Sequence, residues 1–316
     1  MKSFLSVFGC LIGIFCTLSG SQVQNNTVTL ALVGDLMLGR GVAETHQAAG
    51  WEGIFMDIHP ELQIADIALG NLESPLGTSP DCINGSRGYN LCADDSATDA
   101  LASAGFDMLV TANNHHYDCG LDNPSSTRDI LNAAGITALD ENNSPLEKQV
   151  RGIKLAFLAY DDISHALDKP KVLSTIQEAA SINDVVIVSM HWGMEYQGGP
   201  TSRQKRLARE ISRAGADLVW GHHPHVLQRM EWIERNNDQP PTLVAYSLGN
   251  ALFDQTYTTD TRQSVILQVK IDKEGVASVN ATPYMIGWQN HIPYLPDPAT
   301  RRSILRQLHL DEPMEK

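Results

Sequence analysis

The chain has few basic residues. Its 316 residues include 23 lysines and arginines against 37 aspartates and glutamates, which gives a formal net charge of −14 at pH 7. A surface that binds nucleic acid needs clustered positive charge, so this composition argues against a nucleic-acid partner. An acidic surface also repels an anionic substrate. Such a substrate would have to be held by local positive charge, from a metal ion or from individual arginines.

Long apolar runs are also scarce, because only residues 4–18 form one. This run follows Lys2 and precedes the small residues 19–21, and it is short for a membrane span. Charged, apolar and small segments in this order are typical of a secretory signal. We therefore expect residues 1–21 to be a signal peptide and the mature protein to be periplasmic or extracellular. An uncleaved N-terminal membrane anchor is the alternative.

Cysteine is rare as well, and three cysteines follow this segment: Cys82, Cys92 and Cys119. An exported protein meets an oxidising compartment, where disulfides form. Cys82 and Cys92 flank a loop rich in glycine and asparagine, and we expect them to pair. Cys119 would then be the odd thiol. Three reduced cysteines are the alternative.

Composition and patterning indicate one globular domain over residues 22–316. Hydrophobic residues make up 42% of the chain, as expected of a protein with a sizeable core. Apolar, β-branched runs at 28–33 and 185–190 alternate with helical patterns such as 201–214, which predicts an α/β fold. Four runs in the last third have hairpin-like spacing and predict antiparallel strands: 226–234, 242–247, 264–271 and 276–285.

The stretch Gly221-His222-His223-Pro224-His225 is the clearest candidate for a functional site. It places three imidazoles within four residues, directly after the short apolar run 217–220. Imidazole is a common metal ligand, and ligand sites gather beyond the carboxyl ends of strands in α/β sheets. The segment therefore predicts a metal-binding loop. A surface loop that is merely rich in histidine is the alternative.

Other strand ends repeat this pattern. Residues that can ligate a metal follow five apolar runs: Asp35, Glu73, Asn114 with His115, His191, and His223 with His225. Because the carboxyl ends of strands share one rim in an α/β sheet, we expect these groups to converge. For Asp35 the alternative role is a helix N-cap. Arg40, in the same segment, could hold an anionic group or could simply be a solvated arginine.

The ligand types indicate which metal would bind. Carboxylate, amide and imidazole groups without a thiolate suit a catalytic centre for Zn, Mn, Fe or Ni. Six ligands are too many for one metal with an open position, so we expect two divalent metal ions. Two such ions can bind an attacking water and stabilise anionic oxygens in phosphoryl or acyl transfer.

Six motifs, taken together, resemble the poly-γ-glutamate capsule-synthesis (CapA) family between about residues 28 and 271. They are Gly34–Arg40, Gly70–Leu76, Ala112–His115, His191–Tyr196, Gly221–Gln228 and Tyr246–Asn250. The resemblance implies the calcineurin-like metallophosphoesterase fold, in which two packed mixed sheets are flanked by helices in an α/β/β/α arrangement.

The resemblance also implies roles for individual residues. Asp35 and His225 would bind the first metal, Glu73 would bridge the two, His191 and His223 would bind the second, and Asn114 would be the amide ligand. His115 would be the acid/base residue. From the residues themselves, we expect Arg40 to bind substrate and His222 and Glu195 to orient the ligands; a structural role for His222 and a solvated acid for Glu195 are the alternatives. Two departures weaken the match to ordinary phosphoesterases: Met37 stands where they usually have a histidine, and Glu73 where they usually have an aspartate.

Two functions follow from the resemblance. The first is a metal-dependent hydrolase or transferase acting on an anionic polymer, or on a smaller anionic ester or amide of the envelope, with membrane proteins of capsule synthesis as candidate partners. The second is a non-catalytic accessory protein of polymer assembly or export. The complete ligand set favours the first function. Met37 and the acidic surface favour the second.

We predict that the mature protein begins near residue 22, because the small residues 19–21 end the apolar run. N-terminal sequencing of the secreted or periplasmic fraction tests this prediction. A cytosolic protein that still begins at Met1 would contradict it.

Overall fold

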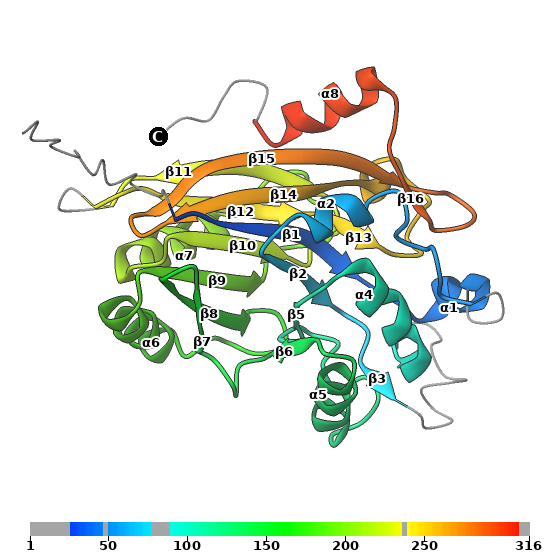
Figure 1. The fold of residues 1–316 in the computed structure, drawn as a ribbon, viewed down its shortest axis with the longest axis horizontal. Coiled ribbons are helices and arrows are strands. Elements are labelled where there is room, and N and C mark those ends of the chain that lie inside the picture. Colours follow the sequence, from blue (N-terminus) through cyan, green and yellow to red (C-terminus); the bar gives the residue numbers. More distant parts are fainter. Residues whose placement is uncertain (1–25, 47–49, 78–88, 236–238, 310–316) are drawn as a thin grey trace, which may run out of the picture.

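Two β-sheets pack face to face in the computed structural model, which describes residues 26–46, 50–77, 89–235 and 239–309 (Figure 1). The first sheet has eight strands, in the order β16-β15-β14-β1-β2-β5-β6 with β13 paired to β1. Its strands are β1 (Val28–Leu36), β2 (Ile67–Leu72), β5 (Met108–Val110), β6 (Thr137–Leu139), β13 (Asn250–Leu252), β14 (Gln263–Asp272), β15 (Gly275–Ile286) and β16 (Pro293–Tyr294).

The second sheet has six strands, in the order β11-β12-β10-β9-β8-β7. They are β7 (Leu146–Val150), β8 (Ile153–Asp161), β9 (Val185–His191), β10 (Leu218–His222), β11 (Leu227–Ile233) and β12 (Thr242–Leu248). Two short strands, β3 (Leu76–Gly77) and β4 (Ala93–Asp94), pair with each other outside both sheets.

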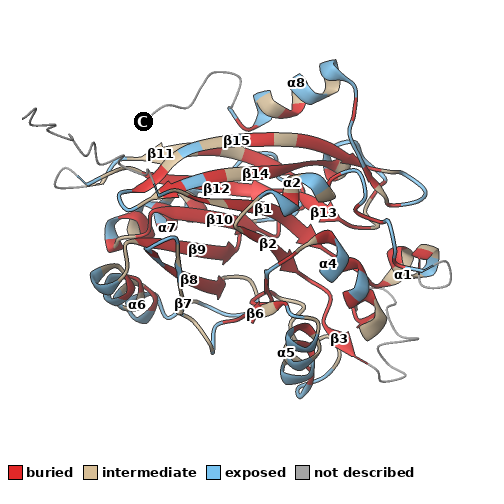
Figure 2. Ribbon diagram, viewed as in Figure 1, coloured by how far each residue is buried: buried red, intermediate tan, exposed pale blue. Residues whose placement is uncertain are grey.

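Alternating side chains explain why the strands sit between two layers. In β1, Val28, Leu30 and Leu32 enter the core between the sheets, whereas Ala31 and Val33 face the outer layer. Successive side chains of a strand point to opposite faces, so a strand covered on both faces must be apolar almost throughout. Figure 2 shows the central strands buried along most of their length. The expected α/β/β/α layering is confirmed.

Helices cover the outer faces of both sheets. Apolar residues of α6 (Lys169–Ile182) and α7 (Ser202–Ala214) pack on the six-stranded sheet, and those of α4 (Thr98–Ala104) and α5 (Asn123–Ala133) pack on the eight-stranded sheet. Helix α8 (Pro298–Gln307) contacts β15 and β11, one strand from each sheet. The shorter helices are α1 (Arg40–His46) and α2 (His59–Gln63), with 3-10 turns η1 (Asp95–Ala97) and η2 (Asp260–Arg262).

Helix α7 shows how local sequence sets the bounds of an element. Thr201 and Gln204 form a capping box at its start, and Gly215 ends it with a φ of +117°. The buried residues Leu207, Ala208 and Ile211 lie on the face that packs against the sheet. The predicted helix is therefore confirmed.

The four strands of the last third exist as predicted, but their pairing differs in part. The pairs β11–β12 and β14–β15 are antiparallel, as expected from hairpin-like spacing. Strand β12, however, also pairs in parallel with β10, and β14 pairs with β1 in the other sheet. Spacing along the chain reports only on sequential neighbours, so it does not reveal that these strands divide between two sheets.

The expected disulfide between Cys82 and Cys92 is wrong, because Cys92 is bonded to Cys119. The Cα atoms of these two residues are 5.7 Å apart, although 27 positions separate them in sequence. Asn90 and Leu91 both donate hydrogen bonds to Asp118, which brings the two segments together. Cys82 and the expected signal peptide lie outside the described residues. None of the described helices is long and apolar enough to cross a membrane.

We predict that tryptic digestion without reduction will release residues 88–128 as one peptide that is two hydrogen atoms lighter than its reduced form. No lysine or arginine lies between Arg87 and Arg128, so a Cys92–Cys119 bond closes a ring within this peptide. A Cys82–Cys92 bond would instead join this peptide to the preceding one. Mass spectrometry before and after reduction separates the two cases.

Candidate metal centre

Parallel strands from both sheets end at one place. In the first sheet, Asp35 of β1 is in register with Asn71 of β2, and in the second sheet His191 of β9 is in register with His222 of β10. Trp220 of β10 donates to the carbonyl oxygen of Val33 in β1 at 3.1 Å, which ties the sheets together just before these ends. The carboxyl ends of β1, β2, β9 and β10 therefore bring their polar side chains together, as the contacts among Asp35, Asn71, His191 and His222 show.

Asp35 lies at the middle of this cluster and is fully buried. Its Oδ1 accepts a hydrogen bond from Asn71 Nδ2 at 2.8 Å and lies 3.2 Å from His222 Nδ1. Its Oδ2 accepts from the backbone N–H of His223 at 3.2 Å and lies 3.3 Å from His225 Nδ1. Asp35 is thus part of β1 and is not a helix N-cap.

Glu73 is also fully buried but is held differently. Its Oε1 lies 3.1 Å from His191 Nε2, and its Oε2 lies 3.9 Å from His225 Nδ1. Among the described residues, none forms a regular hydrogen bond to either carboxylate oxygen. A buried carboxylate without donors is costly unless a cation compensates it, so this position fits a metal ligand.

The histidine loop is held in an unusual backbone conformation. Both His223, with a φ of +91°, and His225, with a φ of +57°, lie in the left-handed region. Arg40 and Tyr196 also have positive φ angles, so four of the seven such non-glycine residues in the described chain lie at this site. Each costs of order 1–3 kcal/mol, and such strain is common where function requires a fixed geometry.

Asn114 and His115 contribute from the loop after β5. Asn114 Oδ1 lies 2.7 Å from His191 Nε2, which places the amide oxygen beside the Glu73–His191 pair. His115 Nδ1 lies 2.8 Å from Asp118 Oδ2. Asp118 thereby fixes the imidazole and leaves Nε2 available. Both Asn114 and His115 are partly exposed, so solvent reaches the cluster from this side.

Three asparagines and Asp118 support the site, although none of them is among the predicted site residues. Asn113 donates to Asn71 Oδ1 at 3.2 Å and accepts from the backbone N–H of His115 at 3.1 Å. Asn250 Oδ1 lies 2.9 Å from His225 Nδ1. Asn71, Asn113 and Asn250 lie within the family-like motifs. No other feature of the sequence indicates that these asparagines support the site.

The remaining predicted residues have different surroundings. His222 is buried against Trp220, with ring centroids 4.3 Å apart, while its Nδ1 faces Asp35. Glu195 is exposed. Arg40 forms an ion pair with Asp254, whose Oδ2 accepts from Arg40 Nε at 3.1 Å. The guanidinium expected to bind substrate is thus held in place by a carboxylate.

Two groups of side chains could each hold a metal ion, and Glu73 belongs to both. One group is Asp35, Glu73 and His191, and the other is Glu73, His223 and His225; within each, the ligand atoms lie within 4.8 Å of one another. The resemblance implies that Asp35 and His225 share a metal, and their side chains do lie together, with His225 Nδ1 3.3 Å from Asp35 Oδ2. Carboxylate and imidazole ligands of this kind fit divalent metal ions.

The buried charges shift the pKa values of the cluster. Burial and the neighbouring Asp35 charge raise the pKa of Glu73 well above its usual value. Burial also acts to raise the pKa of Asp35, but contacts with His222 and His225 hold it well below its usual value. Burial and the charge of His225 lower the pKa of His223 to about 4, which favours the neutral imidazole that a metal requires.

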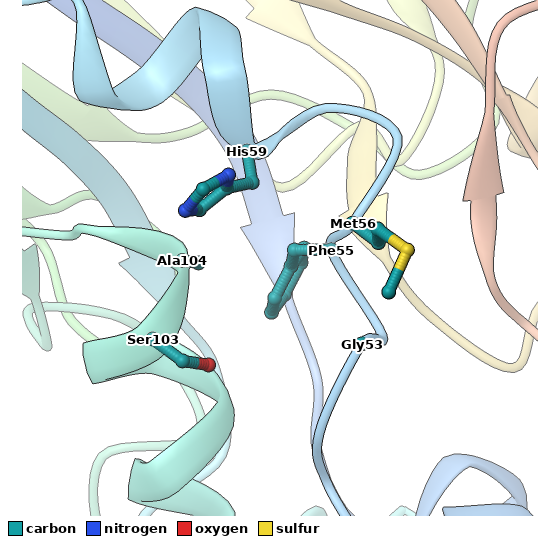
Figure 3. Close-up of a pocket in the computed structure, with 6 residues that line it drawn as sticks. All are labelled: Gly53, Phe55, Met56, His59, Ser103 and Ala104. Atoms are coloured by element: carbon teal, nitrogen blue, oxygen red, sulfur yellow. The ribbon is translucent and has the colours of Figure 1, made fainter.

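A separate hollow of about 200 Å³ lies between the segment 53–59 and the end of α4 (Figure 3). Its lining consists of Gly53, Phe55, Met56, His59, Ser103 and Ala104. The candidate metal ligands are all absent from this lining, in which His59 is the one imidazole. The hollow is therefore separate from the metal centre.

Residues 29–255 match the family described as "Bacterial capsule synthesis protein PGA_cap". The chain belongs to this family. It is 32% identical to the "PGA biosynthesis protein CapA" of Bacillus subtilis (strain 168), with 91% of this chain and 79% of that protein covered. It is 31% identical to the "Capsule biosynthesis protein CapA" of Bacillus anthracis, with 83% and 68% covered.

The fold has a counterpart among solved structures. A hypothetical protein from Thermus thermophilus superposes with a TM-score of 0.53 at 16% identity, covering 81% of this chain and 99% of that one. At this identity the likeness concerns the fold alone. The resemblance to the CapA family is confirmed by the family match and the two Bacillus relatives.

We predict that Glu73→Gln will bind clearly less divalent metal than the unchanged protein, because an amide has no charge and bridges two ions poorly. Elemental analysis after loading with zinc or manganese measures the bound metal. His116→Ala, a neighbour outside the ligand set, is the control and should keep its metal. Full metal content in Glu73→Gln would show that Glu73 is not a ligand.

Proposed function

We propose that this member of the capsule synthesis family is an exported, metal-dependent hydrolase or transferase. Its substrate would be an anionic polymer of the poly-γ-glutamate type, or a smaller anionic ester or amide of the envelope. The observation that carries the proposal is Glu73, a fully buried carboxylate without hydrogen-bond donors in the described chain that is shared by two groups of candidate ligands. Such a carboxylate is typical of a centre that holds two cations.

The residues that would hold the metals are Asp35, Glu73, Asn114, His191, His223 and His225. Two bound divalent ions, of Zn, Mn, Fe or Ni, would supply positive charge for the substrate's anionic oxygens and would activate a nucleophile. This local charge would also offset the repulsion between an anionic substrate and a chain of net charge −14.

His115 would move a proton at the edge of the centre. Asp118 holds its Nδ1, so Nε2 is the atom that could donate a proton to a leaving group. The backbone N–H of His115 donates to Asn113, and Asn113 in turn donates to Asn71 and to the carbonyl oxygen of Leu72. His115 is therefore positioned relative to the ligands by a chain of hydrogen bonds.

Two observations support export. Residues 1–21 have the layout of a secretory signal, and the Cys92–Cys119 disulfide is typical of an oxidising compartment. Membrane proteins of capsule synthesis are the partners we propose for the exported protein.

Met37 favours a second candidate function, that of a non-catalytic accessory protein in polymer assembly or export. Its side chain is fully buried, and its sulfur accepts from the backbone N–H of Gly39 at 3.1 Å. It therefore adds no ligand where ordinary phosphoesterases usually have a histidine. Assays of the metal-loaded protein on phosphoesters and on γ-glutamyl amides distinguish the two functions, because an accessory protein would turn over neither.

We predict that His115→Ala will lower turnover by about 10²–10⁴-fold, as expected for loss of a general acid or base, while the metal content stays nearly unchanged. Asp118→Asn should give a smaller loss, because the imidazole remains but is less firmly oriented. Turnover and elemental analysis of the same preparations test both statements. If His115→Ala loses metal as readily as Glu73→Gln, the role assigned to His115 is wrong.

A further inference from the structure

Exposed aromatic side chains gather beside the candidate metal centre. Aromatic residues make up only 6% of the chain, yet Tyr196, Tyr257, Trp288 and Tyr294 are exposed by 45%, 64%, 66% and 37%. They come from three separate segments: the loop after β9, the loop after β13, and the turn and strand after β15. We call these four residues the aromatic strip.

Tyr196 joins the strip to the metal centre. Its ring centroid lies 6.2 Å from that of the candidate ligand His225. Its backbone N–H donates to the carbonyl oxygen of Pro224 at 2.8 Å, and its hydroxyl oxygen accepts from Gln255 at 3.0 Å. The ring is thus fixed from both ends, and its backbone is held at a φ of +60°.

Contacts link the segments of the other three rings to that of Tyr196. Tyr257 lies next, with its ring centroid 6.4 Å from that of Tyr196. Thr256 Oγ1 donates to the carbonyl oxygen of Trp288 at 2.9 Å, which holds the two loops together. Arg262 then lies over the Trp288 ring, 6.0 Å from its centroid, and reaches the hydroxyl of Tyr294 at 3.5 Å.

These rings do not contribute to the hydrophobic core. Exposing several aromatic side chains in one place is unfavourable in water, and such patches usually mark binding surfaces. The charges here are mixed, because Arg40 is paired with Asp254 and Arg262 lies over the Trp288 ring. The strip therefore suits the uncharged, flat parts of a ligand better than a dense row of negative charges.

We propose that the aromatic strip binds the backbone of a carboxylate-bearing polyamide chain whose reacting group lies at the metal centre. This inference rests on the proposed function and adds the surface that holds the substrate. Amide planes and methylene groups would pack on Tyr196, Tyr257 and Trp288. Arg262 has five N–H donors, and its hydrogen bonds to Ile286 and Tyr294 use two, so others can meet a carboxylate of the chain.

Titration calorimetry of the full-length, metal-loaded protein with a γ-linked glutamate decamer tests the proposal. Trp288→Ala and Tyr257→Ala should each raise Kd roughly tenfold, in line with the loss of one aromatic contact. Ile182→Ala is the matched control, because Ile182 is exposed by 62% at the end of α6 and should leave Kd unchanged. Since both aromatic side chains are mostly exposed, the variants should remain folded.

Salt separates stacking from charge as the source of affinity. The ratio of Kd between each strip variant and the unchanged protein should change by less than about threefold between roughly 50 and 300 mM salt, because packing on an aromatic ring is not screened, whereas a contribution from exposed charges would fade. An unchanged Kd in both aromatic variants would overturn the proposal, and so would a ratio that falls steeply towards one as salt rises. A neutral hexose oligomer that binds as tightly, and loses affinity in the same variants, would overturn it in favour of a glycan ligand.

Calorimetry measures binding and the assays measure turnover. The proposal of the aromatic strip and the proposal of a hydrolase can therefore be contradicted independently. Weaker decamer binding in the strip variants, with no turnover of any substrate, would support the strip and count against the hydrolase. Turnover of the decamer with the same KM in the strip variants and the unchanged protein would overturn the strip and leave the hydrolase standing.

Discussion

The close packing of Gly34 against the carbonyl group of Gly249 is the constraint on which the site depends. A Cβ atom on Gly34 would overlap that oxygen, so only glycine allows the end of β1 to approach the turn between β12 and β13. The next residue, Asp35, donates its backbone N–H to the same oxygen at 3.0 Å and pairs in parallel with Asn250. Asn250 also contacts His225. The contact between Gly34 and Gly249 therefore brings the Asp35 carboxylate of the first sheet to the histidine loop between β10 and β11 of the second sheet.

The buried polar groups of the centre lower the free energy of unfolding of the protein. Two fully buried carboxylates, Asp35 and Glu73, lie among imidazoles, and only Asp35 is well supplied with donors in the described chain. Burying a charge without full compensation is unfavourable, and the positive φ angles of His223 and His225 add to the cost. A packed apolar seam would be more stable here. The polar cluster is therefore best explained by what it binds, and the continuous apolar core between the sheets supplies the stability that tolerates it.

Much of this centre could be predicted because its ligands follow buried strands. Periodicity located β1, β9 and β10, and the rule that parallel strands share a rim brought Asp35, His191 and His223 together from the sequence alone. The supporting asparagines could not be found this way, since Asn71 lies inside an apolar strand and its partners are distant in sequence. The disulfide was mispredicted for a related reason: Cys82 is near Cys92 along the chain, whereas hydrogen bonds to Asp118 bring Cys119 to it. Short elements such as β6 and β13 have too few residues to show a period.

The candidate metal centre lies on paired strands, whereas the aromatic strip begins on the loops beyond them. Asp35, His191 and His222 lie in strands whose pairing fixes their backbones, so the metal centre is tied to the core. Tyr196 and Tyr257 lie in the loops that follow β9 and β13, with their ring centroids 6.4 Å apart. Exposed loop positions tolerate substitution because little packing depends on them. Substitutions in these loops could therefore alter the chain that is recognised while the centre that would act on it stays intact.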